Sequence, residues 1–133
     1  MSSIRPSLDS SLPRVLLIDD DADGLELMAF LLEGSGFSVR CAATGLDGIS
    51  IALAWQPHAL VIDLDLPDMS GDDVAARVRA LGLSAKLVAL SGFGRAAQHA
   101  RAAGLDAYLV KPVDIAELVS VLHDTPEVSA AAT

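Results

Sequence analysis

Four short apolar runs in this chain each stop at a polar side chain, and this recurrence restricts the fold more than any other feature. The runs, each with the residue that ends it, are Val15–Ile18 before Asp19, Ala59–Ile62 before Asp63, Leu87–Leu90 before Ser91, and Ala107–Val110 before Lys111. Continuous apolar runs of this length are typical of strands buried on both faces of a parallel sheet. Because parallel strands end at one edge, where open α/β sheets bind ligands, the sequence predicts a site of carboxylates, a hydroxyl and an ammonium there.

Amphipathic helical patterns separate these predicted strands. Asp21 or Asp23 can cap the first helix, and Thr44 can cap the second. A short Ala-rich helix is predicted over Arg95–Ala103. The side chains predicted to face the core are Leu25, Met28, Leu31 and Leu32 in the first helix, Leu46, Ile49 and Leu53 in the second, Val74, Val78 and Leu81 in the third, and Ile115, Leu118, Val119 and Leu122 in the last.

One predicted strand differs from the others. Residues Phe37–Cys41 alternate apolar with polar, which is typical of a half-exposed edge strand, and Cys41 is expected to be a small core residue. With this strand, five strands alternate with five helices. That order predicts an α/β domain, with a parallel sheet covered by helices on both faces.

Length and charge limit the class of protein. The 133 residues suffice for one domain, expected over residues 14–123, with a flexible lead-in at 1–13 and a flexible tail at 124–133. The net charge of −9 opposes direct binding of nucleic acid, which needs a basic face. No apolar run approaches a membrane span, and the first residues lack the apolar stretch of a secretory signal, so we expect a cytoplasmic protein.

The polar residues at the strand ends form a recognisable pattern. Asp19-Asp20 follows the first strand, Asp63 precedes Leu66-Pro67 with Gly71 closing the loop, Ser91 follows the fourth strand, and Lys111-Pro112 follows the fifth. In this the chain resembles the receiver domain of two-component response regulators, from about Arg14 to His123. The resemblance implies a flavodoxin-like, doubly wound sheet with strand order 2-1-3-4-5. The edge-strand pattern of Phe37–Cys41 agrees with that order.

The resemblance also implies a chemistry. Asp63 would accept a phosphoryl group from a phosphohistidine on a sensor histidine kinase or a histidine phosphotransfer protein. Clustered carboxylates call for a hard divalent cation, Mg²⁺ or Mn²⁺. The remaining roles implied are metal binding by Asp19, Asp20, Asp63 and the backbone carbonyl of Asp65, phosphoryl binding or switching by Ser91, Lys111 and Tyr108, and structural roles for Pro67, Gly71 and Pro112, with a cis Lys111–Pro112 peptide bond.

Several alternatives remain open from the sequence. Tyr108 is either a switching aromatic or a packed one, and Asp65 is either a site residue or a solvated loop acid. The chain could be a pseudo-receiver, an interaction module that is never phosphorylated. Less favoured is a phosphatase or phosphotransferase that uses Asp63 and Asp65, because that motif would stand here on the third strand without room for a substrate lid. As a receiver, the chain is expected to have no independent enzymatic substrate. Its phosphorylated surface is expected to bind a downstream protein, whose identity the sequence does not reveal.

Overall fold

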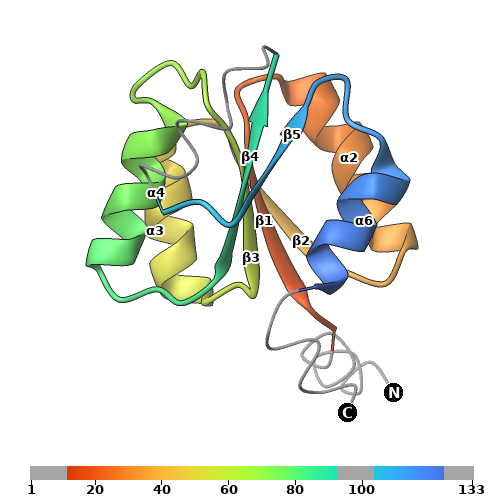
Figure 1. Ribbon diagram of the computed structural model, residues 1–133, viewed down its shortest axis with the longest axis horizontal. Coiled ribbons are helices and arrows are strands. Elements are labelled where there is room, and N and C mark those ends of the chain that lie inside the picture. Colours follow the sequence, from red (N-terminus) through yellow and green to blue (C-terminus); the bar gives the residue numbers. More distant parts are fainter. Residues whose placement is uncertain (1–11, 93–103, 125–133) are drawn as a thin grey trace.

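The computed structural model describes residues 12–92 and 104–124, which form one five-stranded parallel sheet. The strand order β2-β1-β3-β4-β5 is the predicted order 2-1-3-4-5 (Figure 1). The strands are β1 (Arg14–Ile18), β2 (Ser38–Ala42), β3 (Ala59–Asp63), β4 (Lys86–Ser91) and β5 (Ala107–Val110). The doubly wound, flavodoxin-like architecture is therefore confirmed, with β2 and β5 at the two edges of the sheet.

Helices cover both faces of this sheet. Within the described ranges they are α2 (Ala22–Gly34), α3 (Gly45–Trp55), α4 (Gly71–Ala80) and α6 (Ile115–His123). Figure 1 shows α2 and α6 on one face, and α3 with α4 on the other. The helix predicted over Arg95–Ala103, most of the lead-in and the tail from residue 125 lie outside the described residues. No helix of the described segments is long and apolar enough to cross a membrane.

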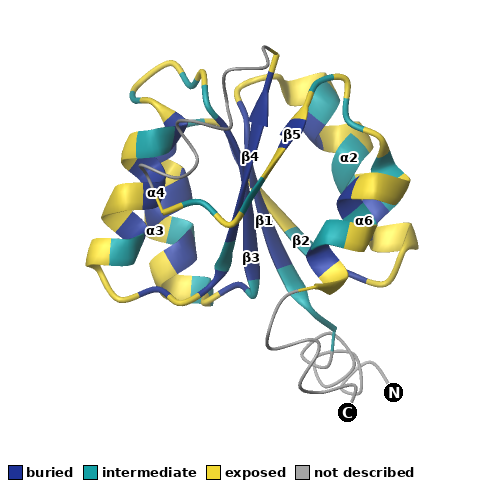
Figure 2. Cartoon of the chain, in the orientation of Figure 1, coloured by how far each residue is buried: buried dark blue, intermediate teal, exposed yellow. Residues whose placement is uncertain are grey.

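Two apolar cores lie on opposite faces of the sheet, because successive strand residues point to opposite sides. Leu16, Ile18 and Leu60 belong to the core beneath α3 and α4. Val15 and Leu17, which alternate with the first two, belong to the core beneath α2 and α6. The central strands are consequently buried along most of their length (Figure 2). These buried strands fix the edge at which the polar residues emerge.

The buried face of α3 differs from the prediction. Leu46 is 58% exposed and Leu53 is 40% exposed, whereas Ile49 is buried as predicted. The other buried positions of the helix are small, namely Gly45, Gly48 and Ala52. Because these residues have little or no side chain, α3 approaches the sheet closely on a face that apolar periodicity does not reveal. A Cβ at Gly48, for example, would collide with the side chain of Ile18.

Two further core assignments were wrong. Leu81, predicted to face inward, is the exposed C-cap of α4, because the helix ends one residue earlier. Cys41 is exposed on the edge strand, where it lines an open groove with Phe30 and Glu33 of α2 instead of packing in the core. The last helix followed the prediction more closely, since Leu118 and Leu122 of α6 are fully buried. The last strand did not, because β5 lies at the edge of the sheet and exposes Tyr108 and Val110.

Candidate functional site

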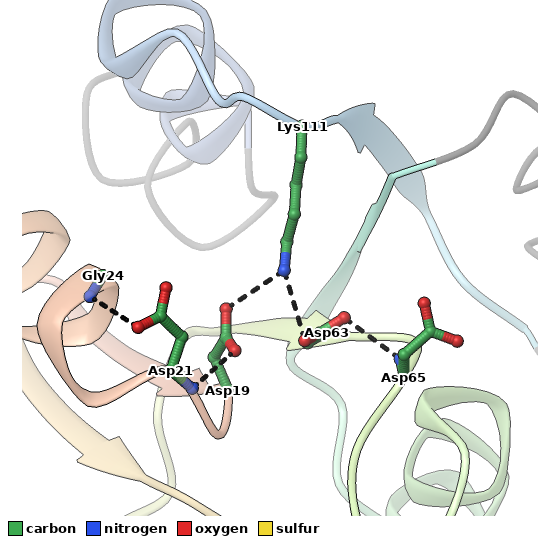
Figure 3. A network of polar contacts seen from close by, with 6 residues as sticks. All are labelled: Asp19, Asp21, Gly24, Asp63, Asp65 and Lys111. Atoms are coloured by element: carbon green, nitrogen blue, oxygen red, sulfur yellow. Dashed lines mark hydrogen bonds and ion pairs between the residues drawn. The ribbon is translucent and has the colours of Figure 1, made fainter.

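Asp63 is the last residue of β3 and lies at the carboxyl edge of the sheet. It pairs in register with Leu90 of β4, and only 4% of its surface is exposed. Its Oδ1 accepts a hydrogen bond of 3.0 Å from the backbone N–H of Asp65, as Figure 3 shows. The strand and the turn that follows it therefore hold this carboxylate in a fixed orientation.

The second buried acid of the site is Asp19, which directly follows β1. Its backbone N–H donates to the carbonyl of Ala42, and its Oδ1 accepts a 3.0 Å hydrogen bond from the N–H of Asp21. Asp21 in turn caps α2 by accepting from the N–H of Gly24, as predicted. Asp20, between them in the sequence, is exposed. Asp21 is thus occupied as a helix cap, next to the acids that face the site.

Lys111 joins the two buried acids. Its Nζ lies 3.2 Å from Oδ2 of Asp63 and 3.4 Å from Oδ2 of Asp19 (Figure 3). Lys111 directly follows β5, so the contact brings together residues from the ends of three strands. The Lys111–Pro112 peptide bond is cis, as the resemblance implied.

Burial and the neighbouring charges change the pKa values of Asp19 and Lys111 in this cluster. Burial raises the pKa of the Asp19 carboxyl above its ordinary value, with a further contribution from the charge of Asp63 and opposing contributions from the N–H of Asp21 and the ammonium of Lys111. Burial alone would lower the pKa of Lys111, but the charges of Asp19 and Asp63 outweigh it and raise that pKa above 10.5. Lys111 is therefore a fixed cation at neutral pH.

The acids also form a set that fits a metal ion. Among the described residues, Asp19, Asp20 and Asp63 each offer a carboxylate oxygen, and these oxygens lie within 4.8 Å of one another. Three hard oxygen donors with a net negative charge suit a small divalent cation, which prefers carboxylate and carbonyl oxygen. The donor set therefore fits the metal that the sequence predicted, while the part assigned to the Asp65 carbonyl stays a prediction.

Ser91 and Tyr108 occupy the neighbouring strands. Ser91 is the buried last residue of β4, pairs with Val110, and accepts a 2.8 Å hydrogen bond at its carbonyl from the N–H of Lys111. It therefore lies at the same edge as Asp63 and Lys111. Tyr108 in β5 is 41% exposed, so the alternative of a tyrosine packed in the core is wrong. The switching role predicted for Tyr108 stays a prediction.

The loop between β3 and α4 is closed tightly beneath Asp63. Gly71 donates its N–H to the carbonyl of Leu64, and Asp65 forms an isolated bridge with Ser70. A Cβ at Gly71 would lie 2.6 Å from the carbonyl oxygen of Asp63 and 2.8 Å from Cα of Leu64. Only glycine allows this approach, which explains the structural role predicted for it. Pro67 lies exposed on the same loop.

The polar contacts of two aspartates were not foreseen, one beside the site and one at the opposite edge of the sheet. Asp68, in this loop, accepts hydrogen bonds from the N–H groups of Gly45 and Leu46 at the start of α3. Asp106, just before β5, accepts from the N–H of Leu87 and pairs with Arg79 of α4 at 2.8 Å. The cap signal of Thr44 marks where α3 begins, but no local pattern reveals a partner that lies 23 residues away, as Asp68 does from Gly45.

Known proteins are similar to this chain in sequence and architecture. The transcriptional regulatory protein PrrA of Mycobacterium leprae is 39% identical over 114 residues, which is 83% of this chain and 48% of PrrA. The chain thus spans about half the length of the curated relatives it matches. The response regulator receiver domain (CheY-like) from Methylobacillus flagellatus has a similar structure, with a TM-score of 0.77, 34% identity, and coverage of 86% of this chain and 98% of that one.

A second solved structure gives the same result. The response regulator receiver domain protein (CheY-like) from Methanospirillum hungatei superposes with a TM-score of 0.82 and 28% identity, over 90% of this chain and 98% of that one. The family model described as response regulator receiver domain matches residues 15–123, which include all the polar strand ends described above. With this match, the fold and the relatives in agreement, the chain belongs to the response regulator receiver domain family.

Proposed function

We propose that this chain is a phosphorylatable receiver, which takes a phosphoryl group onto Asp63 from a phosphohistidine of a sensor histidine kinase or a histidine phosphotransfer protein. The observation that carries the proposal is the setting of the Asp63 carboxylate. One oxygen is held by the N–H of Asp65 and the other faces the ammonium of Lys111. A buried carboxylate held in this way is a preorganised nucleophile with a cation beside it.

The proposed transfer is a single displacement at phosphorus. A carboxylate oxygen of Asp63 forms a bond to phosphorus while the bond from phosphorus to the donor imidazole nitrogen breaks, and the imidazole leaves with that electron pair. Lys111 neutralises a phosphoryl oxygen, and the Ser91 hydroxyl binds another. A Mg²⁺ or Mn²⁺ ion held by Asp19, Asp20, Asp63 and the Asp65 carbonyl would neutralise the remaining charge.

The phosphorylated state would differ from the free one in its surface. Ser91 moves toward the phosphoryl group, and Tyr108 on the adjacent strand follows, so that a downstream protein meets a changed surface. PrrA, one of the relatives named above, is a transcriptional regulatory protein, while the net charge of −9 opposes direct contact of this domain with nucleic acid. In this proposal the chain acts in the cytoplasm, and residues 14–123 form the receiver domain.

The proposal is tested by intact-mass measurement after incubation with acetyl phosphate and Mg²⁺. We expect one phosphoryl adduct on the wild-type chain and none on Asp63→Asn. Asp65→Asn and Asp21→Asn are matched controls, because each neutralises a nearby acid without removing the proposed nucleophile. An undiminished adduct on Asp63→Asn would show that the acceptor is another residue. The absence of any adduct on the wild-type chain would favour the pseudo-receiver.

The Asp65→Asn variant also separates the enzyme alternative, when turnover of a phosphorylated substrate is measured beside the adduct. A phosphatase or phosphotransferase built on Asp63 and Asp65 needs the Asp65 side chain as its second acid, so Asp65→Asn would fail to turn over a phosphorylated substrate. In the receiver proposal only the backbone of Asp65 contributes. Its side chain is exposed and can therefore be neutralised with the adduct retained.

A further inference from the structure

The first backbone N–H groups of α3 donate hydrogen bonds to two side chains, one next to the helix in sequence and one distant from it. The first N–H groups of a helix have no partner within the helix. Thr44 Oγ1 accepts from the N–H of Asp47 at 3.1 Å, which is an ordinary local cap. The N–H groups of Gly45 and Leu46 donate to the two carboxylate oxygens of Asp68, at 2.8 and 3.0 Å. Asp68 thus completes the first turn of a helix to which it does not belong.

Close packing accompanies this polar contact. Met69, the residue after Asp68, lies so near α3 that a Cβ at Gly45 would come within 2.5 Å of its Cγ. Met69 and Leu66 also pack against the core beneath α3 and α4. The pKa of the Asp68 carboxyl is lowered by the hydrogen bonds from Gly45 and Leu46, which favour its charged form. The tip of the β3–α4 loop is therefore seated on α3 by charge, hydrogen bonds and apolar contact together.

The base of the same loop is attached to the site. The N–H of Asp65 donates to Oδ1 of Asp63, and Asp65 bridges to Ser70 across the loop. Asp65 itself is exposed, so its own side chain provides little packing to hold it. Its backbone lies between a base fixed at Asp63 and a tip fixed at Asp68. Releasing the tip would leave the backbone of Asp65 held by the hydrogen bond to Asp63 and the bridge to Ser70 alone.

We propose that Asp68 is a positioning residue: by seating the loop tip on α3, it fixes the backbone of Asp65 and with it the carbonyl assigned to the metal. This inference rests on the proposed function, which supplies the Mg²⁺ ion. Groups that orient a metal ligand from outside the site usually change metal affinity by about 10- to 100-fold when removed. Because Asp68 acts through three residues of backbone, we expect the lower end of that range.

The experiment compares Mg²⁺ dissociation constants, measured by calorimetry at 0.15 M salt, among four variants. Asp68→Ala should weaken Mg²⁺ binding about tenfold, and Asp68→Asn, which keeps one acceptor oxygen, should weaken it less. Thr44→Ala removes the other cap of α3 without touching the loop. Asp47→Asn removes one acid from the same helix end. Both controls should bind Mg²⁺ like the wild-type chain, although Thr44→Ala should lower the thermal unfolding temperature about as much as Asp68→Ala.

A second readout needs no metal. Amide hydrogen exchange at Asp65 and Ser70 should accelerate in the Asp68 variants, and stay at the wild-type rate in Thr44→Ala. Wild-type Mg²⁺ affinity and exchange in both Asp68 variants would overturn the inference, as would an equal loss of affinity in Thr44→Ala, which would tie affinity to helix stability. A wild-type chain that binds no Mg²⁺ would overturn the proposed function together with the role given to Asp68, whereas failure of the Asp68 variants alone leaves that function standing.

Discussion

Lys111 is the residue on which the electrostatics of the site depend. Its ammonium lies within 3.4 Å of two carboxylates that belong to different strand ends and that repel each other. Its raised pKa means that the folded protein holds this proton more tightly than the unfolded chain does. The resulting contribution to stability is fully present below pH 10.5, the pKa of this lysine in the unfolded chain. It is lost as the pH rises through the pKa of Lys111 in the folded protein. At neutral pH the ion pairs of Lys111 therefore make their full contribution to stability.

We predict that Lys111→Met destabilises the metal-free protein by about 1–3 kcal/mol. Breaking a fully buried pair costs about 3–5 kcal/mol, and the value is reduced here because 36% of the lysine side chain is exposed. Urea unfolding measures the difference, which should be constant from neutral pH to about pH 10. Added Mg²⁺ should reduce it, since a second cation then compensates the acids. A loss of stability that is the same with and without Mg²⁺ would contradict this account.

Among the elements, helices α3 and α4 and the loop between β3 and α4 depend on glycines that allow close approach. Gly71 brings the start of α4 against the backbone of Asp63, and Gly45 brings α3 against Met69. These contacts explain why the chain after Asp63 turns back at once, so that the carboxylate stays at the edge of the sheet. In contrast, a Cβ at Gly34, near the end of α2, would meet nothing within 4 Å.

Gly71→Ala and Gly34→Ala should therefore have opposite effects on stability. The first places a methyl group 2.6 Å from a carbonyl oxygen that cannot rotate away, and we expect it to cost about 2–3 kcal/mol. The second fills open space within a helix and should stabilise the protein by about 0.5–1 kcal/mol. The midpoints of denaturant unfolding, compared at an unchanged dependence of stability on denaturant concentration, measure both changes in stability. Equal effects of the two substitutions would mean that the tight approach at Gly71 is relieved by movement of the loop.

The edge strand β5, which leads to Lys111, is held at its start by Arg79 of α4. The two terminal nitrogens of Arg79 donate to the carbonyls of Leu83 and Ala85 and to the carboxylate of Asp106. We predict that Arg79→Met costs about 1–2 kcal/mol, because it leaves two partly buried carbonyls without a donor. Arg79→Lys should not restore stability, since an ammonium lacks the planar fork.

Arg77→Met is the matched control for Arg79→Met. Arg77 lies two residues earlier in the same helix and is exposed, so its loss should change the free energy of unfolding by less than about 0.5 kcal/mol. Urea unfolding of the three variants beside the wild-type chain gives the comparison. A similar cost at Arg77 and Arg79 would attribute the effect to the helix itself, and not to the contacts with Asp106 and with the loop before β4.

The elements could be predicted from the sequence to the extent that local patterns determine them. Asp63, Ser91 and Lys111 were located because each directly follows an apolar run, and a run of four residues fixes where a strand ends. The buried side of α3 could not be predicted, because glycine and alanine carry no hydrophobic signal while Leu46 and Leu53 do. Asp68 and Asp106 were missed for a different reason. Their partners are distant in sequence, and a loop aspartate looks the same whether it is solvated or bonded.

At the scale of the whole molecule, the chain carries a net charge of −9 and gathers three acids at one edge of the sheet. Each acid there is held against the repulsion of the others, and the excess of acids elsewhere adds to it. Binding a divalent cation should therefore stabilise the entire fold through mass action. An ion at ten times its dissociation constant adds about 1.4 kcal/mol.

We predict that Mg²⁺ raises the unfolding free energy of the wild-type chain by about this amount, and that Asp20→Asn abolishes the gain. Without metal, Asp20→Asn should be as stable as the wild-type chain or slightly more stable, because one repelling charge is gone. NaCl at equal ionic strength is the control for screening. A variant that retains the Mg²⁺-dependent gain would show that Asp20 is not a ligand.

The contact between Lys111 and Asp19 joins residues 92 positions apart. During synthesis, the ribosome makes Asp19 and Asp63 well before it makes the lysine that compensates them. Lys111 follows Asp63 by 48 residues, which takes roughly 2–10 s at typical elongation rates. Until then, the growing polypeptide carries its acids without their internal cation. The site therefore cannot be completed on a partly made chain, so the ability to receive a signal arises only once the last strand has been translated and has joined the sheet.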